Sequence, residues 1–174
     1  EVVGVDVSQH TVDTINRGKI HIVETDLDNL VQDCVNTGNL RASLQAEKVD
    51  AFLVAVPTPF KGDHKPDLSY IESAAKTIAP VLEKGNMVIL ESTSPVGTTE
   101  KMMSWMLELR PDLSFPVFGE EGNYDISVAH CPERVLPGKI LYELVHNDRI
   151  IGGMTSKCSD VTLKVYRLFV KGKL

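Results

Sequence analysis

The sequence predicts an α/β fold of the doubly wound type, in which a parallel sheet carries helices on both faces. Short uninterrupted apolar segments, such as residues 50–56 and Met87–Leu90, have the character of parallel strands that are covered on both sides. Each is followed by a segment with apolar residues at helical spacing. Because the connections between them are short, the alternation implies a parallel sheet with right-handed crossovers.

Four elements are expected in the first part of the chain. Residues 1–6 read as a buried strand, and Ser8 can cap a helix that ends at Gly18, where glycine suits a left-handed C-terminal cap. Residues 26–37 carry apolar side chains at helical spacing and a glycine follows them, so a second helix is expected there. A short strand over residues 40–43 is a further candidate.

The same alternation continues to the end of the chain. The glycine- and acid-bearing stretch 116–124 interrupts it and is expected to be a surface loop. The elements expected after residue 50 are strands over residues 50–56, 87–90, 127–130 and 149–151 and helices over residues 67–83, 98–109 and 159–169.

Composition and charge argue against several classes of protein. The net charge is −6 and the basic residues are scattered, whereas a nucleic-acid surface needs a basic stripe. No run approaches the roughly 20 apolar residues that span a bilayer, and no basic-then-apolar leader opens the chain. We therefore expect neither nucleic acid nor a membrane as a partner.

The cysteines and histidines carry no recognisable site. The three cysteines are odd in number, far apart and without zinc-site spacing, which is typical of a reduced, cytoplasmic protein. Each is read as a small core residue, with a catalytic role as the lesser alternative. The five histidines show neither metal nor triad spacing, so no metal is expected.

Candidate ligand-binding residues lie where strands end, because open α/β sheets bind ligands beyond the carboxyl ends of their strands. Asp6 closes the first strand. In a dinucleotide fold, an acid at the end of the second strand accepts hydrogen bonds from the adenosine ribose, which favours NAD over NADP. An acid stabilised by a helix dipole explains Asp6 equally well. A glycine-rich turn before Asp6 would decide between these two roles, and in such folds it lies about 20 residues earlier. We therefore expect the chain to lack that turn and the first strand of the fold.

Two further strand ends carry hydroxyl groups. The two prolines around Thr58 fix the backbone and aim its hydroxyl toward the crevice, although a rigid turn that stops a buried strand is a serious alternative. Residues 91–99 place five hydroxyls and several backbone N–H groups at a helix start, which suits an anionic or polyhydroxyl ligand. Simple capping of the helix would explain one of these hydroxyls.

The fourth strand end carries a carboxylate and a guanidinium side by side. Glu133 could orient a water molecule or act as a base, and Arg134 could bind a phosphate or carboxylate. A local ion pair between the two is the alternative.

Five short motifs occur in the order and at the spacing of one family. They are Gly4-Val5-Asp6, residues 18–24 (Gly-Lys-Ile-His-Ile-Val-Glu), residues 56–59 (Val-Pro-Thr-Pro), residues 91–99 (Glu-Ser-Thr-Ser-Pro-Val-Gly-Thr-Thr) and residues 132–138 (Pro-Glu-Arg-Val-Leu-Pro-Gly). Together they resemble the UDP-glucose/GDP-mannose dehydrogenase family over essentially all 174 residues. The resemblance implies that residues 1–174 are a partial, Rossmann-like NAD-binding domain. Its final helix would lead toward a central connector and a C-terminal UDP-binding domain outside this chain.

The resemblance also implies an activity. Enzymes of this family oxidise the C6 alcohol of a nucleotide sugar to a carboxylate in two NAD-dependent steps, with a cysteine and a connector lysine that lie outside this chain. We therefore expect turnover from a full-length, homodimeric protein that acts on a UDP-sugar for cell-surface polysaccharide biosynthesis, and none from this chain alone. By resemblance, the NAD contacts are Asp6, Thr58 and Thr99, the residues beside the reacting carbon are Thr93 and Glu133, and the residues lining the UDP-sugar site are Arg134 and Val135.

One departure from the family pattern bears on the sugar. UDP-glucose dehydrogenases typically read Pro-Glu-Phe-Leu-Arg-Glu-Gly at residues 132–138, and Pro137 replaces the second glutamate here. This favours the N-acetylmannosamine branch, with UDP-glucose and UDP-N-acetylglucosamine as alternative substrates. A non-catalytic nucleotide-binding module is the alternative from a different class.

Overall fold

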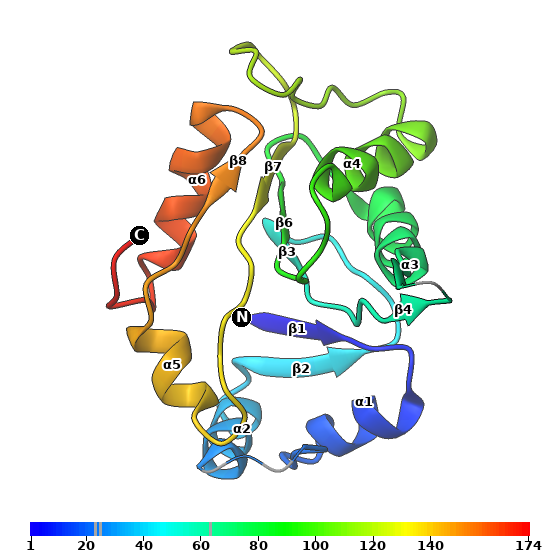
Figure 1. Cartoon of the computed structure of the whole chain (residues 1–174). Coiled ribbons are helices and arrows are strands. Elements are labelled where there is room, and N and C mark those ends of the chain that lie inside the picture. The colour runs from blue at the N-terminus through cyan, green and yellow to red at the C-terminus, as the bar shows by residue number, and fades with distance from the viewer. Residues whose placement is uncertain (23, 25, 63) are drawn as a thin grey trace. The chain divides into compact units, whose positions relative to one another are not determined.

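The computed structural model describes residues 1–22, 24, 26–62 and 64–174 (Figure 1). Val23, in the second of the five motifs, lies outside the described residues. The chain folds into two compact units, each of which is described by itself. Unit 1 comprises Glu1–Ala46 and Arg134–His146, and unit 2 comprises Glu47–Glu133 and Asn147–Leu174.

Unit 1 contains a parallel two-stranded sheet. Strand β1 (Val2–Val5) pairs with β2 (Leu40–Ser43), and the helices are α1 (Gln9–Asn16), α2 (Leu27–Asn36) and α5 (Ile140–His146). The Ser8 hydroxyl accepts the Thr11 N–H and so caps α1, as the sequence predicts. The Asn16 side-chain amide exchanges two hydrogen bonds with the backbone of Ala42, at 2.7 and 3.0 Å, and fastens α1 to β2.

Unit 2 is built on a four-stranded mixed sheet in the order β3-β6-β7-β8. Strands β3 (Ala51–Val54), β6 (Met87–Leu90) and β7 (Ser127–His130) are parallel, and β8 (Gly152–Gly153) runs antiparallel to β7. The other elements are the hairpin β4 (Phe60–Lys61) and β5 (Lys65–Pro66), the helices α3 (Ser69–Ile78), α4 (Thr98–Leu109) and α6 (Ser156–Tyr166), and the 3₁₀ turn η1 (Ala79–Val81).

Strand β6 is buried along its whole length because helices cover both of its faces (Figure 1). Val88 and Leu90 belong to a core cluster with residues of α3 and α4. Met87 and Ile89 point the other way, into a cluster with residues of α6. Alternate burial on two sides is the packing expected of a doubly wound sheet, so the predicted fold class is confirmed.

Three predicted elements differ from the structure. The strand expected at residues 149–151 is wrong, since the paired residues are Gly152 and Gly153. A Cβ on Gly153 would lie 2.3 Å from the Ser159 backbone nitrogen, so only glycine allows this approach to α6. The helix expected over residues 67–83 ends at Ile78, because Pro80 follows within η1 and lacks an N–H. The last helix spans 156–166 rather than 159–169.

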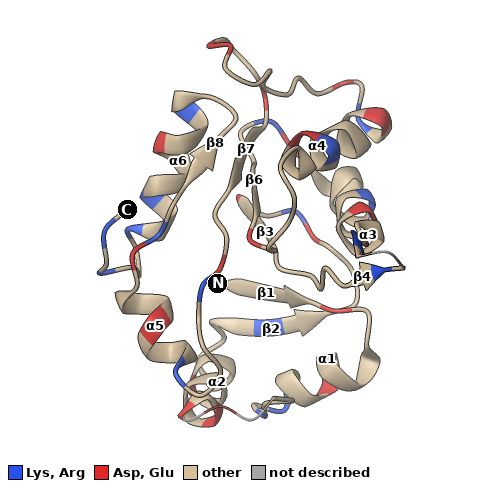
Figure 2. Cartoon of the chain, viewed as in Figure 1, with Lys and Arg blue, Asp and Glu red and all other residues tan. Residues whose placement is uncertain are grey.

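Other differences concern burial and elements that the sequence did not indicate. The first strand is not buried as expected, since Val2 is 61 % and Val5 46 % exposed. Helix α5 and the β4–β5 hairpin were not predicted. Lys and Arg are scattered among Asp and Glu over the described chain (Figure 2). No described helix is long and apolar enough to cross a membrane.

The start of α3 makes stability depend on pH. The Asp67 carboxylate accepts the Ser69 N–H at 3.0 Å and pairs with Lys61 at 2.8 Å, and these contacts lower the pKa of Asp67 from 3.8 to about 2. A carboxyl with a lowered pKa stabilises the fold above its unfolded-state pKa and loses that contribution as the pH falls. Asp67→Asn should therefore lower Tm at pH 7, and the difference from wild type should close between pH 4 and pH 2.

Thermal melts followed by circular dichroism at a series of pH values would test this. Asp160→Asn is the matched control, because no described residue pairs with the Asp160 carboxylate and its replacement removes the same charge. A Tm difference for Asp67→Asn that stays constant down to pH 2 would contradict the prediction.

Candidate active site

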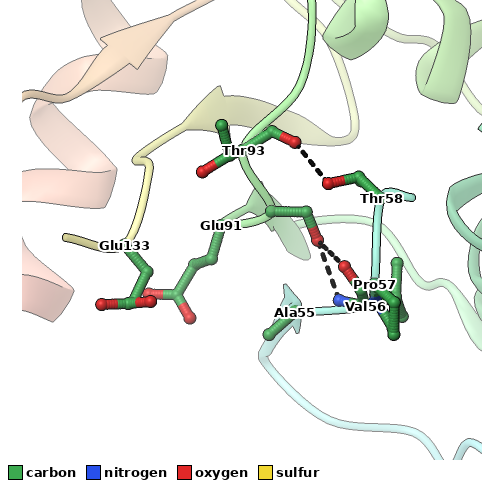
Figure 3. Close-up of a pocket in the computed structure, with 8 residues that line it drawn as sticks. Ala55, Val56, Pro57, Thr58, Glu91, Thr93 and Glu133 are labelled. Carbon is green, nitrogen blue, oxygen red and sulfur yellow. Dashed lines mark hydrogen bonds between the residues drawn. The ribbon is translucent and has the colours of Figure 1, made fainter. Parts of the chain in front are cut away.

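A cavity of about 290 Å³ opens at the carboxyl ends of β3, β6 and β7 in unit 2 (Figure 3). This is the edge of the sheet at which ligands bind in open α/β folds. The residues that line it come from three strand exits: Ala55, Val56, Pro57, Thr58, Glu91, Ser92, Thr93 and Glu133. The structure thus brings three of the predicted site residues, Thr58, Thr93 and Glu133, into one cavity.

The walls of the cavity are tied together through the buried hydroxyl of Ser92. It accepts the Val56 N–H and donates to the Val56 carbonyl, both at 2.8 Å, and so joins the exits of β3 and β6. The exit of β7 is joined to the same wall because the Glu133 N–H donates to the Glu91 carbonyl at 3.1 Å. The three strand exits therefore hold the lining residues on a fixed backbone frame.

The two threonines of the cavity play different parts. The Thr58 hydroxyl donates to the Thr93 carbonyl at 2.8 Å, so its hydrogen is used within the wall while its oxygen can still accept (Figure 3). The Thr93 side chain is exposed to the cavity. Thr58 is thus partly the structural turn residue that the sequence left as an alternative.

In the hydroxyl-rich segment 91–99, some hydroxyl groups bond within the protein and others do not. Ser92 and Thr98 bond within the protein, the latter to the Pro95 carbonyl at 2.7 Å. The Ser94 hydroxyl is buried without a hydrogen-bond partner in the described part of the chain. Thr99 is buried in the first turn of α4, where backbone N–H groups have no partner within the helix. Part of the segment therefore serves the fold, and part could serve a ligand.

Glu91 lines the cavity and begins the strand-end segment 91–99, but the sequence analysis predicted no role for its side chain. Its carboxylate accepts the Tyr166 hydroxyl at 2.5 Å, from the far end of α6 (Figure 3 shows Glu91 beside Glu133). Burial raises the pKa of Glu91, the nearby Glu133 raises it further, and Tyr166 and Arg149 oppose this. In the sequence, Glu91 directly follows a buried strand and belongs to one of the five family motifs, but neither feature indicates Tyr166 as its partner.

The cysteines of unit 2 behave as core residues. Cys131 and Cys158 are fully buried. Burial raises the pKa of the Cys131 thiol, so it is held as the unreactive thiol. No group of three or more metal-type ligands occurs among the described side chains.

The remaining predicted residues lie in unit 1. One oxygen of Asp6 accepts the Ser8 N–H at 2.7 Å. Arg134 and Val135 begin a loop that is held by Glu24, the last residue of the second motif, for which the sequence analysis predicted no contact. The buried Glu24 carboxylate accepts the N–H groups of Gly138 at 2.8 Å and Ile140 at 2.9 Å, at the start of α5.

Comparison with known proteins agrees with these features. Residues 1–170 match the model of the UDP-glucose/GDP-mannose dehydrogenase family, NAD binding domain. The chain is 63 % identical to an NDP-N-acetyl-D-galactosaminuronic acid dehydrogenase of Ralstonia nicotianae and 59 % identical to the UDP-N-acetyl-D-mannosamine dehydrogenase of Escherichia coli. Each alignment covers 99 % of this chain and 41 % of the relative, so the chain spans about two-fifths of the length of these proteins.

Solved structures give the same result. The UDP-N-acetyl-mannosamine dehydrogenase of Staphylococcus aureus superposes with a TM-score of 0.89 at 42 % identity, over 99 % of this chain and 40 % of that one. The corresponding enzyme of Pyrococcus horikoshii also superposes at 0.89, with 40 % identity over the same shares of the two chains. The predicted family and its NAD cofactor are confirmed: the chain belongs to the UDP-glucose/GDP-mannose dehydrogenase family, of which it carries the NAD-binding domain.

Proposed function

We propose that the protein containing this chain oxidises the C6 alcohol of UDP-N-acetyl-D-mannosamine to the carboxylate in two NAD-dependent steps, for polysaccharide biosynthesis. The observation that carries this proposal is the cavity in which two carboxylates and two threonines meet beyond three parallel strands. Names of relatives at about 60 % identity support an N-acetylated nucleotide sugar over UDP-glucose. In the balanced reaction, one alcohol, two NAD⁺ and one water give one carboxylate, two NADH and three protons.

Each predicted residue has a proposed part in this reaction. Thr93 and Glu133 lie beside the reacting carbon, where Glu133 orients water or assists proton transfer. Arg134 and Val135 line the site for the UDP-sugar. Thr58, Thr99 and Asp6 contact NAD.

The residues present fit NAD. No described residue pairs with the second carboxylate oxygen of Asp6, Oδ2, which is therefore free to accept a ribose hydroxyl. The cavity, at about 290 Å³, lies just below the range for whole small-molecule sites, about 300–1,000 Å³. It therefore suits one ring of a dinucleotide. When bound, NAD supplies the acceptor for the hydride.

The rest of the reaction belongs to the remainder of a longer protein. Residues 1–174 are proposed to be part of an NAD-binding domain whose last helix leads to a connector and a UDP-binding domain. The full-length protein is proposed to be a cytoplasmic homodimer. Support for the longer protein is the 41 % share of its relatives that this chain covers.

Absorbance of NADH during incubation of the full-length protein with NAD⁺ and a UDP-sugar tests the proposal. UDP-N-acetylmannosamine should give about two NADH per sugar, faster than UDP-glucose, UDP-N-acetylglucosamine or UDP-N-acetylgalactosamine, and the 174-residue chain alone should give none. Preference for another of these sugars would correct the substrate. Calorimetric binding of NAD without turnover by the full-length protein would favour a non-catalytic module instead.

A further inference from the structure

The loop that begins at Arg134 is closed by a tight turn before α5. The Lys139 N–H donates to the Leu136 carbonyl at 3.1 Å. Between these two residues lie Pro137 and Gly138, and Gly138 has a φ of +85°. Proline followed by a left-handed glycine is the pair that a type II turn prefers at its two central positions. The Gly138 N–H takes no part in the hydrogen bond that closes the turn, so it needs another acceptor.

Glu24 supplies that acceptor from 114 positions away in the sequence. Its carboxylate is buried, and it accepts the Gly138 N–H through Oε2 at 2.8 Å and the Ile140 N–H through Oε1 at 2.9 Å. Hydrogen bonds to an ionised carboxylate are roughly twice as strong as those between neutral groups. A buried carboxylate is also costly unless it is hydrogen-bonded. The turn and Glu24 therefore hold each other in place.

A second carboxylate holds the other side of the turn. Glu143 in α5 accepts the Leu136 N–H at 2.8 Å through Oε2. This bond is exposed and joins residues only seven positions apart. The bonds of Glu24, in contrast, start from a buried side chain that lies in the sequence between α1 and α2. Glu24 is thus the residue that ties the turn to a distant part of unit 1.

We propose that Glu24 is a positioning residue for the UDP-sugar, because it fixes the loop whose first residues are Arg134 and Val135. This rests on the oxidation proposed above, in which these two residues line the substrate site and Glu24 has no part. The loop is short, since Arg134 directly follows Glu133 of the cavity and Ile140 begins α5. With its turn held by a buried carboxylate, the loop is ordered before the ligand arrives. Less conformational entropy is then lost when the UDP-sugar binds.

A role confined to stability is the alternative, since Glu24 also satisfies N–H groups at the start of α5. The two roles predict different kinetics in protein that remains folded. A purely stabilising contact leaves KM unchanged. A positioning contact raises KM for the UDP-sugar but changes kcat little, because Glu24 bonds the backbone of the loop and no reacting atom.

Steady-state NADH formation by the full-length protein separates these roles. Glu24→Gln keeps the shape of the side chain, but its NH₂ group cannot accept a hydrogen bond, so one of the two loop N–H groups loses its acceptor. We expect KM for UDP-N-acetylmannosamine to rise about tenfold, with kcat and KM for NAD⁺ within about threefold of wild type. Asp33→Asn is the matched control, since Asp33 is exposed in α2 of the same unit and its replacement removes the same charge. It should leave all three constants unchanged.

Gly138→Ala tests the turn without altering Glu24. A Cβ at Gly138 would meet no described heavy atom within 4 Å, so the strain falls on its left-handed backbone alone. This variant should also raise KM for the UDP-sugar, and it tests the proposal if thermal melts show that Glu24→Gln folds poorly. Gly122→Ala is its control, because Gly122 has equally open surroundings and no left-handed φ.

Hydrogen exchange in the full-length protein gives a readout that does not depend on activity. The amides of Gly138 and Ile140 should exchange about tenfold faster in Glu24→Gln than in wild type or Asp33→Asn. Calorimetric titration with UDP-N-acetylmannosamine should show the same loss of affinity as KM does.

Three results would overturn the proposal. They are unchanged exchange at Gly138 and Ile140, faster exchange with KM and affinity within about twofold of wild type, and a fall in kcat as large as the rise in KM. A wild-type protein that binds the UDP-sugar without oxidising it would overturn the proposed function alone, and calorimetry would still test Glu24. A wild-type protein that does not bind the UDP-sugar would overturn both.

Discussion

Replacing Leu90 by alanine is expected to lower the free energy of unfolding by about 3–4 kcal/mol. Leu90 is fully buried in the central strand β6 and packs in the core cluster that contains Ile71 of α3 and Met102 of α4. The substitution removes three carbon atoms from a site that strand and helices enclose, so both the transfer term and the cavity term apply. Urea unfolding followed by circular dichroism measures the difference.

The same strand provides a test on its other face. Ile89→Ala should lower the free energy of unfolding by a similar amount, about 2–5 kcal/mol, because Ile89 is fully buried on the face of the sheet that α6 covers. Leu107→Ala in α4 is the control, since Leu107 is 43 % exposed and its replacement should cost less than about 1 kcal/mol. If Leu90→Ala and Leu107→Ala destabilise equally, β6 is not the central covered strand described here.

The sequence predicts this packing well because short local runs of apolar residues indicate which segments are buried. The apolar run Met87–Leu90 is recovered as β6 with its bounds unchanged, and the helix expected over 98–109 is α4. The rule that ligands bind at strand ends also anticipated that Thr58, Thr93 and Glu133 would come close together. These predictions depend on the spacing of apolar residues, on the glycines and prolines that end elements, and on the succession of strands and helices along the chain. A single sequence contains all three.

Contacts between distant residues were not predictable in the same way. Glu91 and Tyr166 are 75 positions apart, and Glu24 and Gly138 are 114 apart, so no local pattern indicates either pairing. Strand β8 consists of two glycines, which have low strand propensity, and forms because a glycine fits against α6. Partners of this kind appear only when the packing of whole elements is known.

The second large effect concerns catalysis. Glu133→Gln in the full-length protein should lower kcat for oxidation of the UDP-sugar by about 10²–10⁴-fold, the usual contribution of a proton-transferring or water-orienting side chain. Its carboxylate lines the cavity and acts electrostatically on Glu91. The amide keeps the shape of the side chain but loses the charge and the ability to accept a proton, so KM should change little. Steady-state NADH formation measures both constants.

Glu120→Gln in the exposed loop is the control and should keep wild-type kcat. A Glu133→Gln variant with more than about a tenth of wild-type kcat would remove Glu133 from the reaction.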